Sequence, residues 1–218
     1  MPFAELLELL DPDPHGAALN MAIDEVLLRQ ASQPLLRVYR WANPAASFGY
    51  FQRIAGIEDR WPRRELVRRW TGGGVVPHGE DLTYTLIVPR HCSFFRRNPL
   101  EAYRAIHESI AMLLEASSVH LAGSAAEKRS NACFENPARH DVILGGQKVA
   151  GAAQRRTELG LLHQGSIQLR PQRPEIRDGL AAVLGRSVRR CELAVETLAL
   201  AHRLANEKYA TAAWLRRF

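Results

Sequence analysis

The chain has 218 residues, of which 46% are hydrophobic and 24% charged. This composition is typical of a globular protein, and no segment approaches the roughly 18 to 20 apolar residues of a membrane-spanning helix. The N-terminal segment lacks the basic start and apolar core of a signal peptide, which favours a cytoplasmic protein with no membrane partner. Cys92, Cys133 and Cys191 form no CxxC pattern, which argues against a disulfide framework or a structural zinc site.

The formal net charge is +6 and the isoelectric point about 9.6, which suits an acidic partner such as a carrier protein. We expect no nucleic-acid partner, because the basic residues are dispersed and form no helix-turn-helix, zinc-finger or RNP motif. Three of the 29 basic residues are lysines: Lys128, Lys148 and Lys208. In a chain that uses arginine almost everywhere, a lysine indicates a position where a compact ammonium matters.

The first part of the chain predicts a helix followed by strands. Apolar residues at helical spacing predict a helix over 17–32, with Asp24 and Glu25 off its apolar face. Alternating apolar and basic residues predict a half-buried strand over 35–41. Further strands are expected over 47–52, over 65–70 ahead of a glycine turn, and most strongly over 82–88.

The second part predicts a helix that begins at Asn98 and Pro99, as cap and first turn. The later expectations are a loop over 117–131, a hairpin over 142–150 that turns at Gly145 and Gly146, a strand over 159–169, and helix from Pro174 onward. The sequence therefore predicts one α/β domain over 1–218, with a mixed, largely antiparallel sheet flanked by helices. A short helical tail is expected from about residue 174.

Three consecutive glycines, Gly72 to Gly74, follow a predicted strand in the segment RRWTGGGVVPH. They let the backbone approach a ligand and point N–H groups at an anion or a carbonyl oxygen. The preceding Arg68 and Arg69 can hold a carboxylate or phosphate. A tight turn between strands is the alternative interpretation, and the segment has neither the P-loop nor the dinucleotide-binding pattern.

Cys133 and Lys148 are the candidates for chemistry. Cys133 lies in the polar segment NACFENP behind the basic pair Lys128 and Arg129, a context that favours an exposed thiol with a lowered pKa. A lone cysteine is nevertheless more often a buried core residue. Lys148 lies in GGQKVAGAAQ, where small neighbours including Gly151 leave room for a ligand. A surface lysine on a hairpin is the alternative.

His163, in the segment LLHQGSI, is a further candidate for the site. A Ser–His hydrolase would need GxSxG at a strand-to-helix elbow, and this segment lies within a predicted strand. A hydrogen-bonded structural histidine is an equally good interpretation. We expect no metal site.

The segments RRWTGGGVVPH, DLTYTLIVP, CFENP, GGQKVAGAAQRR and LLHQGSI, in that order, resemble the lipoate–protein ligase A/octanoyltransferase superfamily, whose fold includes biotin protein ligase. The resemblance runs from about Leu19 to Leu169. It implies a biotin/lipoate protein ligase-like catalytic domain, with an acyl pocket between the arginine–glycine loop and the lysine hairpin. It further implies that Lys148 contacts the acyl carbonyl or acyl phosphate, that Arg69 and Gly72 to Gly74 hold the carboxylate or phosphate side, and that His78 closes the site.

Two mechanisms share such a pocket. An octanoyltransferase takes an octanoyl or lipoyl group from acyl carrier protein onto its own cysteine, and passes it to a lysine of a lipoyl carrier domain, without a cofactor. The carrier is a 2-oxoacid dehydrogenase E2 or glycine cleavage H protein. The Cys-Phe-x-x-Pro segment resembles the LipM type of octanoyltransferase, which implies that Cys133 is the nucleophile. Exchange between two thioesters is nearly balanced in free energy and needs no ATP.

An ATP- and Mg²⁺-dependent lipoate–protein ligase is the alternative, because the loop reads Gly-Gly-Gly as in ligases. Little sequence follows Leu169, so a ligase would need a separate accessory subunit. A non-catalytic acyl- or nucleic-acid-binding protein on the same scaffold is a third hypothesis. We expect the transferase.

Overall fold

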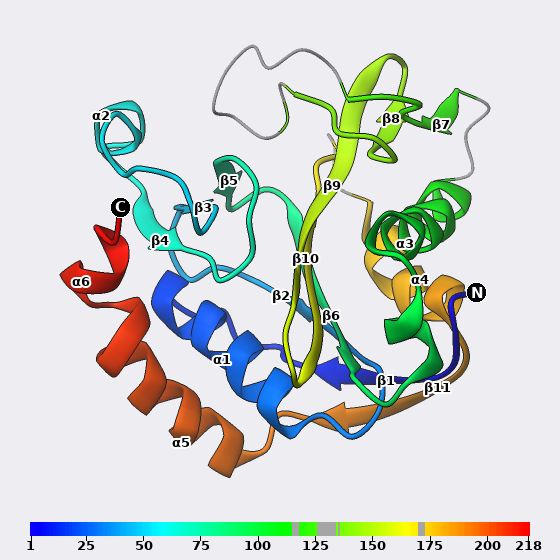
Figure 1. Ribbon diagram of the computed structural model, residues 1–218, viewed down its shortest axis with the longest axis horizontal. Coiled ribbons are helices and arrows are strands. Elements are labelled where there is room, and N and C mark those ends of the chain that lie inside the picture. The colour runs from blue at the N-terminus through cyan, green and yellow to red at the C-terminus, as the bar shows by residue number, and fades with distance from the viewer. Residues whose placement is uncertain (115–117, 126–133, 135, 170–172) are drawn as a thin grey trace.

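The computed structural model describes residues 1–218 except 115–117, 126–133, 135 and 170–172 (Figure 1). The strands in this part are β1 (Phe3–Leu10), β2 (Leu35–Tyr39), β3 (Ala45–Phe48), β4 (Glu65–Arg68), β5 (Val76–His78), β6 (Leu82–Pro89), β7 (Val119–Leu121), β8 (Val142–Leu144), β9 (Gln147–Arg156), β10 (Gly160–Ile167) and β11 (Gly185–Glu192). The helices are α1 (Ala17–Gln30), α2 (Ile57–Arg60), η1 (Ser93–Arg96), α3 (Pro99–Leu113), α4 (Pro174–Leu184), α5 (Val195–Leu204), η3 (Ala205–Tyr209) and α6 (Ala212–Leu215).

The described strands form two sheets. The larger has the order β11-β1-β2-β6-β10-β9-β8-β7 and is antiparallel from β2 to β7, while β1 pairs in parallel with β2 and β11. The smaller sheet has the order β4-β3-β5, with β3 parallel to β4 and antiparallel to β5. The prediction of a mixed, largely antiparallel sheet flanked by helices is confirmed.

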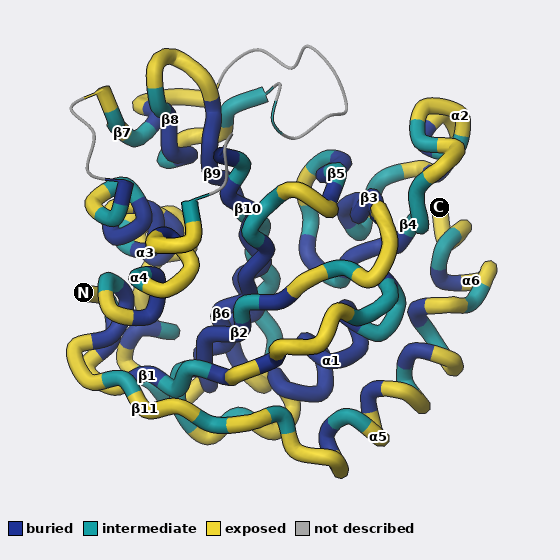
Figure 2. The backbone as a smooth tube through the Cα atoms, turned by 180° about the vertical axis from the view of Figure 1, so that it is seen from behind, coloured by how far each residue is buried: buried dark blue, intermediate teal, exposed yellow. Residues whose placement is uncertain are grey.

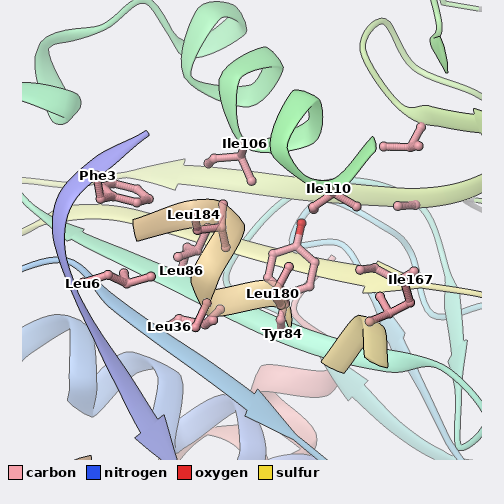
Figure 3. Close-up of a cluster of buried hydrophobic side chains, with 14 of the residues drawn as sticks. Phe3, Leu6, Leu36, Tyr84, Leu86, Ile106, Ile110, Ile167, Leu180 and Leu184 are labelled. Carbon is pink, nitrogen blue, oxygen red and sulfur yellow. The ribbon is translucent and has the colours of Figure 1, made fainter. Parts of the chain in front are cut away.

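Helices cover both faces of the large sheet, so its central strands are buried on two sides (Figures 1 and 2). On one face, Ile106 and Ile110 of α3 and Leu180 of α4 pack against β1, β2 and β6 (Figure 3). On the other face, α1 and α5 pack over the opposite side chains of β2, β6 and β10. This two-sided burial gives β6 and β10 a fixed position, on which a site can be built.

The predicted helix over 17–32 is confirmed as α1, but its acidic residues are buried. Asp24 and Glu25 are 0% and 1% exposed. Half-burial of the strand over 35–41 is wrong, because Arg37 of β2 is 0% exposed. Its guanidinium donates to Asp11 at 2.8 Å and to Asp24 at 2.7 Å, so the buried charges are neutralised by each other. The basic residue that suggested a solvent-exposed face of the strand belongs to an internal ion network.

Local turn chemistry fixes the predicted hairpin and the predicted start of α3. Gly145 and Gly146 have φ of +56° and +79°, which suits the tight turn between β8 and β9. The Asn98 side chain accepts a hydrogen bond from the backbone N–H of Leu100 at 2.9 Å, so it caps α3. Both predictions are confirmed.

The prediction of continuous helix from Pro174 onward is wrong over Gly185–Glu192. This segment is strand β11, which pairs in parallel with β1 along its length. Most of its side chains are exposed, as is usual at a sheet edge (Figure 2). The strand forms because β1 offers unpaired backbone groups at the edge of the sheet, a partner that helical periodicity does not reveal. Residues 117 and 126–131 of the loop predicted over 117–131 lie outside the described residues, and its part at Val119–Leu121 is β7.

Candidate active site

A cavity lies where α1, the glycine loop after β4, and strands β9 and β10 meet. One wall is made of small residues of β9 and β10, which leave space in front of the sheet. The other walls are aromatic and polar. The lining residues are Met21, Tyr39, Trp41, Ser47, Arg69, Gly73, Val76, His78, Thr83, Gly151, Ala152, Ala153, Gln164, Gly165 and Ser166.

Of the two arginines ahead of the glycine loop, Arg69 lines the cavity. Its guanidinium donates to the backbone carbonyls of Gly72 and Gly74, at 2.9 and 2.8 Å. These two hydrogen bonds fix the conformation of the glycine loop around the guanidinium. Arg68 points away and is 0% exposed, donating to four backbone carbonyls of the segment after β3 and of α6 and its end. Of the two neighbouring arginines, Arg69 is therefore a cavity residue and Arg68 a structural one.

His78, at the end of β5, is fixed from several sides. Its Nδ1 lies 2.8 Å from Asp81 Oδ2, and its ring stacks on Trp41 with centroids 4.1 Å apart. Burial alone would raise the pKa of Asp81, but His78 and the hydroxyls of Ser166 and Thr83 outweigh burial and lower it to about 2. Asp81 is therefore ionised near neutral pH and orients the imidazole.

Lys148 lies on β9 beside the cavity, and its side chain is 2% exposed. Its Nζ is 2.7 Å from Asp141 Oδ2, and the Tyr103 hydroxyl donates to the other oxygen of Asp141 at 2.5 Å. A Cβ at Gly151 would sit 2.4 Å from Lys148 Cε, so only glycine lets the lysine fold over this part of β9. Because Gly151 lines the cavity, the ammonium stands at the cavity's edge.

Phe134, the residue after Cys133, contacts the same lysine. Cys133 itself lies outside the described residues. The Lys148 Nζ stands 5.1 Å from the centroid of the Phe134 ring, within the range of a cation–π contact. The chain neighbour of the candidate nucleophile is therefore in contact with the candidate electrostatic group.

His163 does not line the cavity. Successive side chains of a strand face opposite sides of the sheet, and Gln164 takes the α1 side, where it binds Asp24 at 2.8 Å. His163 takes the α3 side, where it is hydrogen-bonded to Tyr84 at 3.2 Å and to Gln154 at 3.0 Å. Burial lowers the pKa of His163 well below its ordinary value. Its surroundings support the structural interpretation.

Sequence reasoning placed Arg69, Gly73, His78 and Gly151 at the site, and the structure brings them to one cavity, with Lys148 at its edge. It missed the groups that hold them: Ser47, Asp81, Tyr103 and Asp141. Asp81 could have been found from its position three residues after His78, and Asp141 from its position at the start of the lysine hairpin. Ser47 and Tyr103 carry no local signal, because their partners lie far away in the chain.

Within the described ranges, no three His, Cys, Asp or Glu side chains are grouped so that they could hold a metal ion. In the same ranges no helix has the length and apolar character needed to cross a bilayer.

Residues 16–197 match the family described as the lipoyl protein ligase A/B catalytic domain. Curated relatives include the octanoyltransferase LipM of Oceanobacillus iheyensis, 37% identical over 171 residues, which cover 73% of this chain and 63% of that protein. The LipM of Staphylococcus aureus is 34% identical, over 68% of this chain and 60% of that protein. The chain thus spans just under two thirds of the length of these relatives.

Solved structures share the fold. Lipoate-protein ligase A bound with ATP matches with a TM-score of 0.76 at 19% identity, over 98% of this chain and 99% of that one. The bi-partite lipoate protein ligase of Thermoplasma acidophilum matches with a TM-score of 0.73 at 20% identity, over 98% of this chain and 96% of that one. These structural matches confirm the predicted lipoate ligase-like fold.

Proposed function

Because the chain belongs to the lipoyl protein ligase A/B catalytic domain family, we propose that it is an octanoyltransferase of protein lipoylation. It would take an octanoyl group from acyl carrier protein onto Cys133 and deliver it to a lysine of a lipoyl carrier domain, in a 2-oxoacid dehydrogenase E2 or glycine cleavage H protein. We further propose that residues 1–218 act as a single catalytic domain. The observation that carries the function is the contact between Phe134, next to Cys133, and Lys148 beside the cavity.

The proposed reaction has two acyl transfers. In the first, the Cys133 thiolate attacks the thioester carbonyl, and the carrier's thiolate leaves and takes up a proton. In the second, the amine of the acceptor lysine attacks the new thioester, loses a proton, and releases the Cys133 thiolate. Each attack places negative charge on the carbonyl oxygen, and the buried ammonium of Lys148, which contacts Phe134 next to Cys133, can stabilise that charge.

The cavity suits an acyl chain and a polar head at one end. Gly151, Ala152 and Ala153 form a smooth wall along which methylene groups can pack. Arg69 and His78 line the same cavity, where they can contact the carbonyl end or the thioester. These groups orient the substrate, and the Lys148 ammonium stabilises the negative charge on the carbonyl oxygen.

A lipoate–protein ligase is the second candidate, favoured by the triple-glycine loop at the cavity and by Arg69 curled within it. In that reaction ATP and Mg²⁺ would activate the free acid, and Arg69 and Lys148 would face the acyl phosphate. The transferase needs no such cofactor.

The two candidates separate in a transfer assay with a lipoyl domain as acceptor. With octanoyl-acyl carrier protein and no ATP, we expect the wild type to modify the acceptor. Cys133→Ser should abolish this transfer, while Cys92→Ser and Cys191→Ser should retain it. Transfer by Cys133→Ser from free octanoate and ATP, at the wild-type rate, would establish the ligase instead.

A further inference from the structure

A continuous chain of hydrogen bonds joins the two polar groups of the cavity wall through Ser47. Arg69 Nη1 donates to Ser47 Oγ at 2.7 Å, and Ser47 Oγ lies 2.6 Å from His78 Nε2. His78 Nδ1 lies 2.8 Å from Asp81 Oδ2. Arg69 follows β4 and His78 ends β5, so residues of two strands are linked by a hydroxyl on the strand between them, β3.

One arrangement of protons satisfies all four groups. A guanidinium can only donate, so Ser47 Oγ accepts from Arg69, and in this arrangement the Ser47 hydroxyl donates its own proton to His78 Nε2. His78 then carries its proton on Nδ1 and donates it to the carboxylate of Asp81. In this arrangement every member of the chain is satisfied, and the tautomer of His78 is fixed from both ends.

The backbone of β3 holds Ser47 in place. Ser47 is opposite Val67 of β4 and Val76 of β5 in the three-stranded sheet, and the residue is 1% exposed. Loss of the Ser47 hydroxyl would therefore release two cavity groups together. Ser166 offers a comparison: it lines the same cavity and donates to Asp81 at 2.6 Å, but it does not lie between Arg69 and His78.

We propose that Ser47 is a positioning residue for the acyl-transfer reaction, which couples the Arg69 guanidinium to the Nε2 face of His78. The inference rests on the proposed function, since it assigns Arg69 and His78 to the binding of the thioester end. Ser47 acts through these two groups and forms no bond with the acyl chain. Its hydroxyl keeps both aimed into the cavity in the geometry that the transition state requires.

The test compares Ser47→Ala with Ser166→Ala, two variants that each remove one hydroxyl from the same cavity. We expect Ser47→Ala to lower kcat on the order of 10- to 100-fold, with a smaller change in KM. Added to His78→Gln, Ser47→Ala should lower kcat by a smaller factor than it does in the wild type, because one of its two partners is already lost. If the double variant lost kcat by the full product of the two single-variant factors, the proposal would be contradicted. A turnover of Ser47→Ala within about threefold of the wild type would also contradict it.

A nitrogen-15 spectrum of the His78 imidazole provides a readout that does not depend on activity. The Nε2 resonance should change in Ser47→Ala, and should change less in Ser166→Ala, whose partner is Asp81. An unchanged Nε2 resonance in Ser47→Ala would overturn the coupling, even if the wild type transfers no acyl group. Acylation of Ser47 in Cys133→Ala, detected by peptide mass spectrometry, would also overturn it by making Ser47 a nucleophile.

Discussion

Lys148 and Lys208 lie in two clusters of the same composition, each with a buried carboxylate and a tyrosine. Lys148 Nζ is 2.7 Å from Asp141, to which Tyr103 also donates at 2.5 Å. Lys208 Nζ is 2.5 Å from Glu25, to which the Tyr209 hydroxyl donates at 2.6 Å. In both clusters the carboxylate raises the pKa of the tyrosine above its ordinary value, in addition to the larger effect of burial.

The surroundings of the two lysines differ. Lys208 has the rings of Trp70 and Trp214 at 4.6 and 4.3 Å from its Nζ, and its carboxylate partner belongs to α1. It therefore fastens the C-terminal helices to α1. Lys148 has Gly151 against its own side chain and the cavity beyond. We therefore propose that the same three groups serve structure at Lys208, where tryptophan rings enclose the ammonium, and chemistry at Lys148, where small residues leave space beside it.

Removal of each lysine should have different effects on turnover and on stability. Lys148→Ala and Lys148→Arg should each lower turnover on the order of 10²–10³-fold, since the loss of one electrostatic donor typically has that effect and arginine has a wider, planar head. Both variants should remain folded by circular dichroism. Lys208→Ala should keep turnover within about threefold of the wild type and lower the midpoint of thermal unfolding. Turnover near wild type in Lys148→Ala would make it a structural lysine too.

Removal of the carboxylates should separate stability from rate. Asp141→Asn and Glu25→Gln each leave a lysine without its charged partner, so each should lower the free energy of unfolding by about 3 kcal/mol or more. Only Asp141→Asn should also lower kcat, by roughly 10- to 100-fold, because Lys148 loses its position. Urea unfolding and steady-state kinetics on both variants check this. An equal loss of kcat in Glu25→Gln would remove the distinction between the clusters.

Acid should destabilise the region around the Lys148 cluster, because two buried histidines, His107 and His163, pack against its Tyr103. Burial lowers the pKa of His107 to about 4, and that of His163 well below its ordinary value. The unfolded chain binds these protons from about pH 6.5 downward and the folded chain does not, so stability falls as the pH drops from about 6.5 to 4. For His107 this loss is roughly 3 kcal/mol.

His107→Asn tests this because asparagine can keep the donor that binds the His140 carbonyl at 2.7 Å. Its free energy of unfolding should fall less than that of the wild type between pH 7 and pH 4.5, measured in urea. The same pH dependence in both proteins would show that His107 does not contribute.

Salt should act on a step that neither lysine cluster controls. Attraction between the basic surface and an acidic carrier is screened over a Debye length of about 8 Å at roughly 0.15 M salt. The KM for acyl carrier protein should therefore rise several-fold with salt, while hydrolysis of a small octanoyl thioester changes little. Equal sensitivity of both substrates would show that salt perturbs the cavity and not docking.

The sequence predicted the elements whose signals are local. Helix α1, strand β6, the cap of α3 and the glycine hairpin each follow from neighbouring residues. Strand β11 could not be predicted in this way, because it exists through its pairing with β1 at the other end of the chain. The burial of Arg37 was missed for the same reason, since its charge is balanced by carboxylates that precede it by more than ten residues.

In the candidate site, too, some residues have a local sequence signal and others depend on partners that are distant in the chain. Arg69, His78 and Lys148 stand in short motifs and could be recognised as a set. The groups that aim them, Ser47 and Tyr103, act across strands and across the sheet. Local sequence motifs therefore identify the candidate residues, and the fold determines how their side chains are oriented.

Intact-mass spectrometry of the protein mixed with octanoyl-acyl carrier protein, without ATP and without an acceptor domain, shows whether Cys133 takes up the acyl group. We expect a gain of one octanoyl group, sensitive to hydroxylamine and absent in Cys133→Ser. Lys148→Ala should gain the group far more slowly, and Lys208→Ala at close to the wild-type rate. No adduct on the wild type under these conditions, together with ATP-dependent modification of a lipoyl domain, would contradict the proposed transfer through Cys133.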